Sequence, residues 1–108
     1  MSPPPNVLLV TADHLRYDTL GATGDPVIRT PAIDSLASQG VLFRRCFVQN
    51  PVCQPSRATF MTGRYPRNHG VRWNGDRLNE NEMTRVEFFK RQGYTTACVG
   101  KHHMAQAR

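Results

Sequence analysis

The chain has 108 residues, so we expect one small domain or part of a larger one rather than several domains. Its 39% hydrophobic and 20% charged residues are typical of a globular protein and exclude a disordered, collagen-like or coiled-coil chain. Fourteen Lys and Arg against eight Asp and Glu give a net charge of +6, which suits nucleic acid, anionic membranes and anionic substrates equally.

Neither a membrane segment nor a disulfide framework is expected. The longest apolar run near the start, Val7 to Val10, is too short for a membrane span or for the core of a signal peptide. We therefore predict a cytoplasmic protein with no membrane partner. The three cysteines are an odd number and form no C-x-x-C pair, which argues against disulfides and against a structural zinc site.

The first part of the chain predicts a strand, a helix and a second strand. Asn6 to Val10 is an unbroken apolar run, as in a strand buried on both faces of a parallel sheet. A helix over 31–39 is expected to have Thr30 as its N-cap and to end at Gly40, with one apolar face. β-Branched and aromatic residues then predict a strand over Val41 to Val48.

The middle of the chain predicts a loop, a helix and a longer loop. Asn50 to Gln54 interrupts the second strand, so we expect Cys53 to lie in a loop that faces a helix N-terminus. That helix is predicted from Pro55 to Gly63, with Pro near its first turn and Gly as its end. Tyr65 to Leu78 is rich in Gly, Asn and Arg and is predicted to be a loop, in which His69 is structural.

The last part of the chain predicts a helix and a third strand. Met83, Val86 and Phe89 form a helical apolar stripe that we assign to the core and that ends at Gly93. Thr95 to Val99 is predicted to be a strand. Strands that alternate with helices indicate an α/β fold with a mostly parallel sheet.

The chemically distinctive segment is Cys53-Gln-Pro-Ser-Arg57. Arg57 is expected on the first helical turn, close enough to hold an anionic or hydrated group at position 53, where the positive helix N-terminus adds to the attraction. An arbitrary lone cysteine is more often a small buried apolar residue. The fixed offsets of Pro55 and Arg57 from Cys53 favour a chemical role over simple burial.

Four segments resemble the sulfatase family, in the order in which that family has them. The segment from Cys53 to Arg64 resembles the sulfatase signature, whose cysteine is oxidised to formylglycine. Residues 6–21 resemble the family's first strand and metal loop, 30–37 its first helix, and 93–103 its second signature. The resemblance implies a sulfuric ester hydrolase, and the N-terminal part of an alkaline phosphatase-like three-layer fold with a mostly parallel sheet.

The resemblance also implies a mechanism. Hydrated formylglycine from Cys53 carries two hydroxyls; one attacks the sulfur with the help of a divalent metal, and the other then expels sulfate and restores the aldehyde. Arg57 would hold the hydrated aldehyde, while Lys101 and His103 would contact the transferring group and the leaving oxygen. Asn74 would help bind the substrate oxygens, with a plain turn residue as the alternative.

Metal identity and substrate class stay open at this point. The resemblance implies Asp13 and modified Cys53 as metal ligands, which favours calcium, with magnesium or manganese as alternatives. His14 stands where the family more usually has a second aspartate, so it is either a ligand or a substrate contact. Phosphonate and phosphate ester hydrolases of the same superfamily also replace that aspartate, which makes a phosphonate or phosphate monoester the rival substrate.

Residues 1–108 are expected to be an incomplete, N-terminal portion of a sulfatase domain, because no residue after Lys101 matches the family's later metal ligands. We expect the isolated chain to be inactive. The partners implied are a small sulfate or phosphonate ester and a formylglycine-generating enzyme. A basic module for nucleic acid or another polyanion is the distant alternative, but the basic residues are not interleaved with aromatic ones, so we expect no nucleic acid partner.

Overall fold

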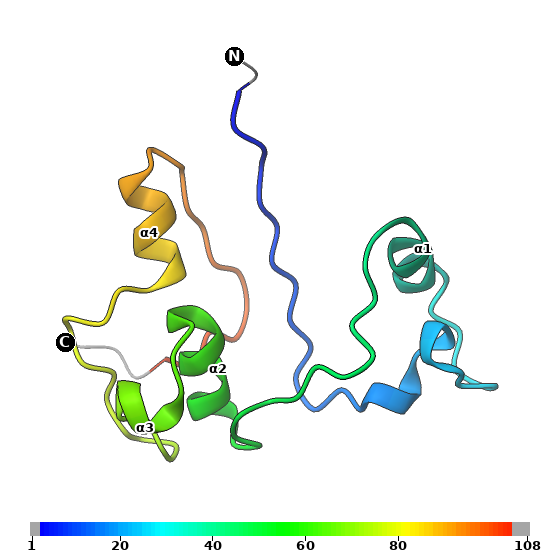
Figure 1. The fold of residues 1–108 in the computed structure, drawn as a ribbon, viewed down its shortest axis with the longest axis horizontal. Coiled ribbons are helices and arrows are strands. Elements are labelled where there is room, and N and C mark those ends of the chain that lie inside the picture. Colours follow the sequence, from blue (N-terminus) through cyan, green and yellow to red (C-terminus); the bar gives the residue numbers. More distant parts are fainter. Residues whose placement is uncertain (1–2, 105–108) are drawn as a thin grey trace. The chain divides into compact units, whose positions relative to one another are not determined.

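The computed structural model describes residues 3–104, which divide into two compact units between Cys46 and Phe47. Both units consist of short helices joined by long irregular or extended segments (Figure 1). Within the described part of the chain, no helix has the length and the apolar character that a membrane crossing requires.

The first unit contains two short 3-10 helices, η1 (Tyr17–Thr19) and η2 (Gly21–Thr23), followed by the α-helix α1 (Pro31–Gln39). The bounds of α1 are those that its proline and glycine signals predict. Its expected apolar face is not covered, because Ile33 and Leu36 are 45% and 73% exposed.

Asp34 joins η2 to α1. Its Oδ1 accepts hydrogen bonds from the backbone N–H of Ala22 at 2.7 Å and from the Thr30 hydroxyl at 2.8 Å. The Thr30 hydroxyl in turn accepts the N–H of Gly21 at 2.9 Å and caps no N–H of α1, so its predicted N-cap hydrogen bond is absent. A Cβ atom at Gly21 would collide with the Asp34 carboxylate, so a larger residue there would have to displace this side chain and its hydrogen bonds.

The second unit contains α2 (Cys53–Thr62), α3 (Pro66–His69) and α4 (Arg85–Arg91). Helix α2 ends where the sequence predicts, since Gly63 takes the left-handed conformation and its N–H bonds to the Thr59 carbonyl at 2.8 Å. The segment predicted as a loop contains the single turn α3, which begins with Pro66.

Helix α4 is shorter than the predicted stripe and begins with a capping box. The Thr84 hydroxyl accepts the N–H of Glu87 at 3.2 Å, and Glu87 Oε2 accepts the N–H of Thr84 at 3.0 Å. Met83 therefore lies outside the helix, and the predicted core positions Met83 and Val86 are 42% and 38% exposed. Phe89 packs edge-on against Tyr94, with ring centroids 5.1 Å apart.

The three predicted strands are not confirmed: the described residues 3–104 contain no β-strand, so this part of the chain shows no parallel sheet. A strand needs the hydrogen bonds of a neighbouring strand, and segments 6–10, 41–48 and 95–99 have no such ladder. Their apolar side chains are consequently exposed: Val10 is 80% and Val99 98% accessible. The first of these segments is the long blue trace in Figure 1.

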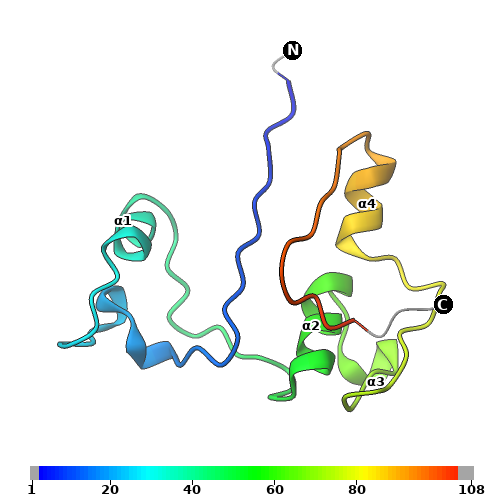
Figure 2. The ribbon, with the colours of Figure 1, turned by 180° about the vertical axis from the view of Figure 1, so that it is seen from behind.

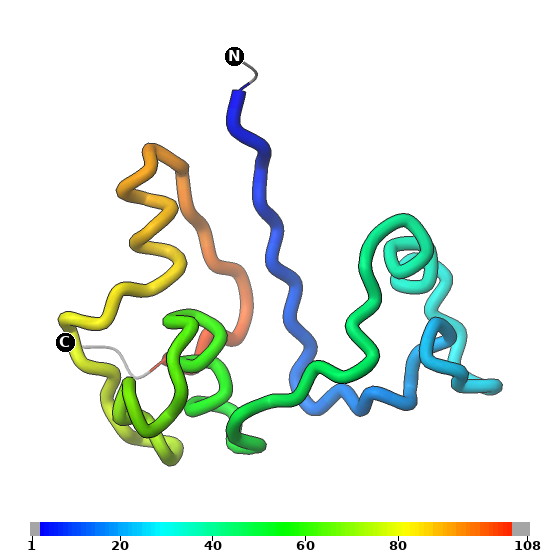
Figure 3. The backbone as a smooth tube through the Cα atoms, viewed as in Figure 1, coloured from blue at the N-terminus to red at the C-terminus, as the bar shows by residue number. Residues whose placement is uncertain are grey.

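The buried part of the second unit lies around α2 and α3. Seen from behind in Figure 2, the chain turns back after α4 and its last described residues pass beside α2. The tube in Figure 3 traces the same return. Six side chains in this region are buried, and half of them are polar or charged: Gln54, Pro55, Arg57, Ala58, His69 and Val71.

The capping box gives the first prediction. Thr84→Ala should destabilise α4 by about 1 kcal/mol, because an alanine cannot accept the N–H of Glu87. Urea unfolding followed by far-UV circular dichroism measures this loss. The matched control is Thr95→Ala, which removes the hydroxyl of an exposed threonine after α4. Equal unfolding midpoints for the two variants would contradict a stabilising role of the cap.

Candidate functional site

Cys53 is the first residue of α2, so the prediction that it lies in a loop is wrong. The helix begins two residues before its predicted start at Pro55. Val52 is extended and acts as the N-cap, and the N–H of Ser56 bonds to its carbonyl at 3.1 Å. Pro55 then occupies the third helical position, where a missing N–H costs nothing because the first N–H groups of a helix have no partner within it. The helix therefore starts before the proline.

Asn74 supplies the cap that α2 lacks at Val52. Its Oδ1 atom accepts the backbone N–H of Gln54 at 3.1 Å and the thiol of Cys53 at a sulfur–oxygen distance of 3.4 Å. The Val52 side chain can provide no such bond. The predicted site residues Cys53 and Asn74, which are 21 residues apart in the chain, are thus in direct contact.

Gln54 holds the segment that carries Asn74. Its side chain is 3% exposed and both ends of the amide are used. Oε1 accepts the N–H of Gly75 at 2.7 Å, and Nε2 donates to the carbonyl of Asp76. A buried amide with both ends satisfied carries no desolvation penalty for an unpaired group.

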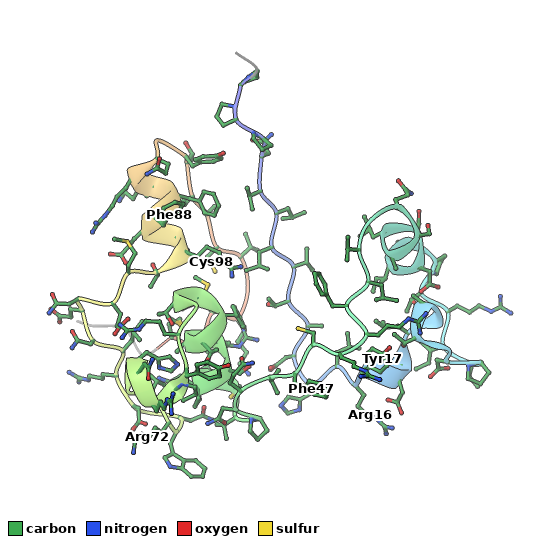
Figure 4. The ribbon with its side chains drawn as sticks, in the orientation of Figure 1. Arg16, Tyr17, Phe47, Arg72, Phe88 and Cys98 are labelled. Carbon is green, nitrogen blue, oxygen red and sulfur yellow. The ribbon has the colours of Figure 1, made fainter. Side chains whose placement is uncertain are left out.

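The segment 72–76 forms a tight turn, which we call the Asn74 turn. The Asp76 carboxylate closes it, since its Oδ2 accepts the N–H groups of Arg72 at 2.7 Å and Trp73 at 2.9 Å. These two hydrogen bonds lower the pKa of Asp76, because they favour the ionised form. Gly75 has φ = 101°, a conformation that disfavours any side chain. Arg72, at the start of the turn, is labelled in Figure 4.

Arg57 connects α2 to the last described segment. Arg57 is buried, at 7% exposure, and its Nη1 donates to the carbonyl of Lys101. The Lys101 residue is exposed and His103 is half-buried. His103 has φ = 43°, and its buried Nδ1 atom has no hydrogen-bond partner within residues 3–104. Arg57 thus holds the backbone of Lys101 against α2.

His69 has the structural role that the sequence predicts. It is 2% exposed, its Nδ1 accepts the N–H of Val71 at 3.2 Å, and its Nε2 lies 3.1 Å from the Thr59 hydroxyl. The Thr59 hydroxyl already donates to the Pro55 carbonyl, so His69 is neutral and donates from Nε2. Burial lowers the pKa of His69, which favours this neutral form.

The predicted metal ligands are divided between the two units. Asp13 and His14 are exposed residues of the first unit, whereas Cys53 belongs to the second. No three His, Cys, Asp or Glu side chains between residues 3 and 104 gather closely enough to hold a metal ion. This donor set by itself does not fit calcium, which takes about six to eight oxygen ligands.

Three residues of this site were not predicted from the sequence: Gln54, Gly75 and Asp76. Asn-Gly followed by Asp is a turn signal that could have placed Asn74 in a tight turn. No sequence signal marks Gln54, because its partners are more than 20 residues away.

An open depression of about 450 Å³ is lined by residues that precede α2 and by residues around the start of α3: Gln49, Asn50, Tyr65, Pro66 and Arg67.

The family profile described as Sulfatase matches residues 5–107. The chain belongs to the sulfatase family. The members of this family are sulfatase-type hydrolases, as the sequence motifs predict. Human steryl-sulfatase is 41% identical over 95% of this sulfatase-family chain, and an ulvan-active sulfatase of Formosa agariphila is 40% identical over 93% of it. The chain spans only 20% of each of these relatives.

Two solved structures resemble this sulfatase-family chain closely. A phosphonate monoester hydrolase of Agrobacterium radiobacter has a TM-score of 0.81 and 43% identity over 84% of the chain. A putative sulfatase of Bacteroides thetaiotaomicron has a TM-score of 0.79 and 38% identity over 85% of it. The chain covers 18% and 21% of these two proteins. The backbone path therefore follows that of the alkaline phosphatase-like hydrolases over this part.

The Asn74 turn gives a prediction on pH. Since the pKa of Asp76 is lowered by folding, its contribution to stability is present above the unfolded value of about 3.9 and is lost as the pH falls through the lower folded value. Trp73, the only tryptophan, lies in this turn. Its fluorescence should therefore change in a titration below pH about 4, as Asp76 is protonated.

Asp76→Asn should abolish this titration, because an asparagine accepts a hydrogen bond at every pH. Asp25→Asn is the matched control, since Asp25 Oδ1 also accepts two backbone N–H groups but belongs to the first unit. Acid titration of Trp73 emission in the wild type and both variants is the measurement. The same titration in wild type and Asp76→Asn would rule out Asp76 as its cause.

Proposed function

We propose that this chain carries the nucleophile part of a sulfuric ester hydrolase site, in which Cys53 is converted to formylglycine. The observation that carries the proposal is the position of Cys53 at the start of α2, in contact with Asn74. The positive end of a helix favours an anionic group at this point. Oxidation of the Cys53 side chain supplies an aldehyde whose hydrate provides the hydroxyl that attacks the ester sulfur.

Four further residues receive roles in this proposal. Arg57 holds the hydrated aldehyde and anionic oxygens, and it also fixes the backbone of Lys101 beside α2. Lys101 and His103 contact the transferring group and the leaving oxygen. Asn74 presents its amide to the substrate oxygens. A cation and hydrogen-bond donors fixed before the reaction stabilise developing negative charge without reorganisation.

We infer that residues 1–108 are the N-terminal portion of a sulfatase domain with an alkaline phosphatase-like three-layer fold. The chain spans about a fifth of its curated relatives. Segments 6–10, 41–48 and 95–99 have no strand ladder, and most of their residues, the apolar ones included, are exposed. Strands of a mostly parallel sheet have these properties when their neighbours are missing.

The complete site would use a divalent metal, with calcium as the first choice. Asp13 offers a hard carboxylate oxygen, and modified Cys53 and His14 are the other candidate ligands, with His14 as a substrate contact in the alternative. Further donors would have to join them, because the described donor set does not suffice. A formylglycine-generating enzyme is the partner that this proposal requires. The cytoplasmic location stays a prediction.

A phosphonate or phosphate monoester is the second candidate substrate. The observation that favours it is the likeness to a phosphonate monoester hydrolase, with a TM-score of 0.81 and 43% identity. Arg57 and Lys101 are cations that can hold either kind of ester, since sulfate esters and phosphonate or phosphate esters all carry negative charge on the transferring group. Assays of an active enzyme that contains this chain, with an aryl sulfate and an aryl phosphonate side by side, separate the two substrates.

The proposal predicts a selective modification. When the chain is made together with a formylglycine-generating enzyme, Cys53 should become the aldehyde, whereas Cys46 and Cys98 should remain thiols. The reason is that Pro55 and Arg57 follow Cys53 at the offsets of the sulfatase signature, and no such residues follow the other cysteines. Peptide mass spectrometry after reaction with an aldehyde-specific tag measures all three positions in one sample.

Cys46 and Cys98 are exposed free cysteines and serve as internal controls. A chain with Arg57→Ala is the control for the signature itself and should be converted much less. Unmodified Cys53 beside a fully converted reference substrate would contradict the proposed function.

A further inference from the structure

The strongest unassigned feature of the site is the buried amide of Gln54. It lies between the reactive position Cys53 and Pro55, on the N-terminal turn of α2. At 3% exposure it fills space that an apolar side chain could also fill. Instead, both polar ends of the amide form hydrogen bonds to the backbone of the Asn74 turn, at Gly75 and Asp76.

These two bonds act as a clamp with a fixed polarity. Oε1 can only accept, and it receives the N–H of Gly75 at 2.7 Å; Nε2 can only donate, and it reaches the carbonyl of Asp76. The clamp therefore fixes the backbone directly after Asn74. The other side of the turn is held by Asn50, whose Nδ2 donates to the Arg72 carbonyl at 3.2 Å.

The backbone N–H of Gln54 determines which way the Asn74 amide faces. The N–H of Gln54 needs an acceptor, so Asn74 must turn Oδ1 toward it, and it does so at 3.1 Å. The same oxygen receives the Cys53 thiol. With Oδ1 directed at α2, the two Nδ2 hydrogens are directed away from the Gln54 N–H, and Asn74 is exposed. They are available as donors for an anionic oxygen.

We propose that Gln54 is a positioning residue of this site: it clamps the Asn74 turn to α2, so that Asn74 holds the side chain at position 53 with Oδ1 and offers Nδ2 to an anionic ester oxygen. The catalytic meaning of the clamp rests on the proposed function of Cys53. The existence of the clamp does not rest on that function, and it can be tested on the unmodified Cys53 thiol.

The test is the rate at which iodoacetamide alkylates Cys53 in the 108-residue chain, read by peptide mass spectrometry. The same rate in urea provides the unprotected reference, and the exposed Cys46 and Cys98 are internal controls. Because Cys53 is half-buried and Asn74 Oδ1 accepts the hydrogen of its thiol, Cys53 should react more slowly in buffer than in urea. Equal rates for Cys53 in buffer and urea would overturn the proposal.

Gln54→Met separates clamping from packing, since Met has a similar length and fills the same space without either hydrogen bond. It should raise the Cys53 rate in buffer about fivefold, the factor that corresponds to one net hydrogen bond, and leave the other two cysteines unchanged. Asn74→Ala should raise it to a similar degree. An unchanged rate in Gln54→Met would show that Gln54 only packs, and would overturn the proposal.

The double variant decides whether Gln54 acts through Asn74. If it does, Gln54→Met combined with Asn74→Ala should react no faster than Asn74→Ala alone, because the clamp has nothing left to hold. A rate equal to the product of the two single effects, or one that reaches the urea value, would show an independent or global effect and would contradict the proposal. Failure of the aldehyde conversion would instead contradict the function of Cys53 and leave these rates unaffected.

Discussion

The site depends on one capping interaction, the hydrogen bond from the Gln54 N–H to Asn74 Oδ1. Helix α2 begins after Val52, whose side chain cannot accept an N–H, and it carries a proline at its third position. An acceptor from outside the helix is therefore needed at its N-terminus. Asn74 provides it from 20 residues further along the chain, and this places an amide beside the thiol of Cys53.

The same constraint explains why the small core of the second unit contains polar side chains. Gln54 and Arg57 lie on the first turns of α2, and each is bonded to a backbone carbonyl of a distant segment. Buried polar groups are tolerated only with such partners, and they then specify one arrangement of the chain. In this unit, polar contacts rather than a large apolar core hold the turn at 72–76 and the Lys101 segment beside α2.

Local signals in the sequence predicted α1 and the end of α2 correctly, whereas the segment with α3 was predicted to be a loop. Pro31 and Gly40 delimit α1, and Gly63 ends α2, because proline and glycine act on the backbone of their immediate neighbours. The capping box of Thr84 and Glu87 also matches a local signal, the Thr-x-x-Glu pattern. The family resemblance marked Cys53 and Asn74 as site residues, but their contact is a finding of the structure.

The strands and the Gln54 clamp depend on distant parts of the chain. A strand forms only when another strand pairs with it, so the apolar run at 6–10 cannot show by itself whether a neighbour is present. The side chain of Gln54 likewise depends on where Gly75 and Asp76 lie after folding. A local pattern has no access to either kind of contact.

The most direct test of this account is amide hydrogen exchange in the 108-residue chain, followed residue by residue by NMR. The N–H groups of Gln54 and Gly75 are predicted to exchange at least about tenfold more slowly than in an unfolded chain, because both are hydrogen-bonded to side chains across the site. The N–H groups of residues 7–10 should exchange at nearly the unfolded rate, since that segment has no ladder. Unprotected N–H groups at Gln54 and Gly75 would show that the Asn74 turn is not fixed to α2, and would contradict the account.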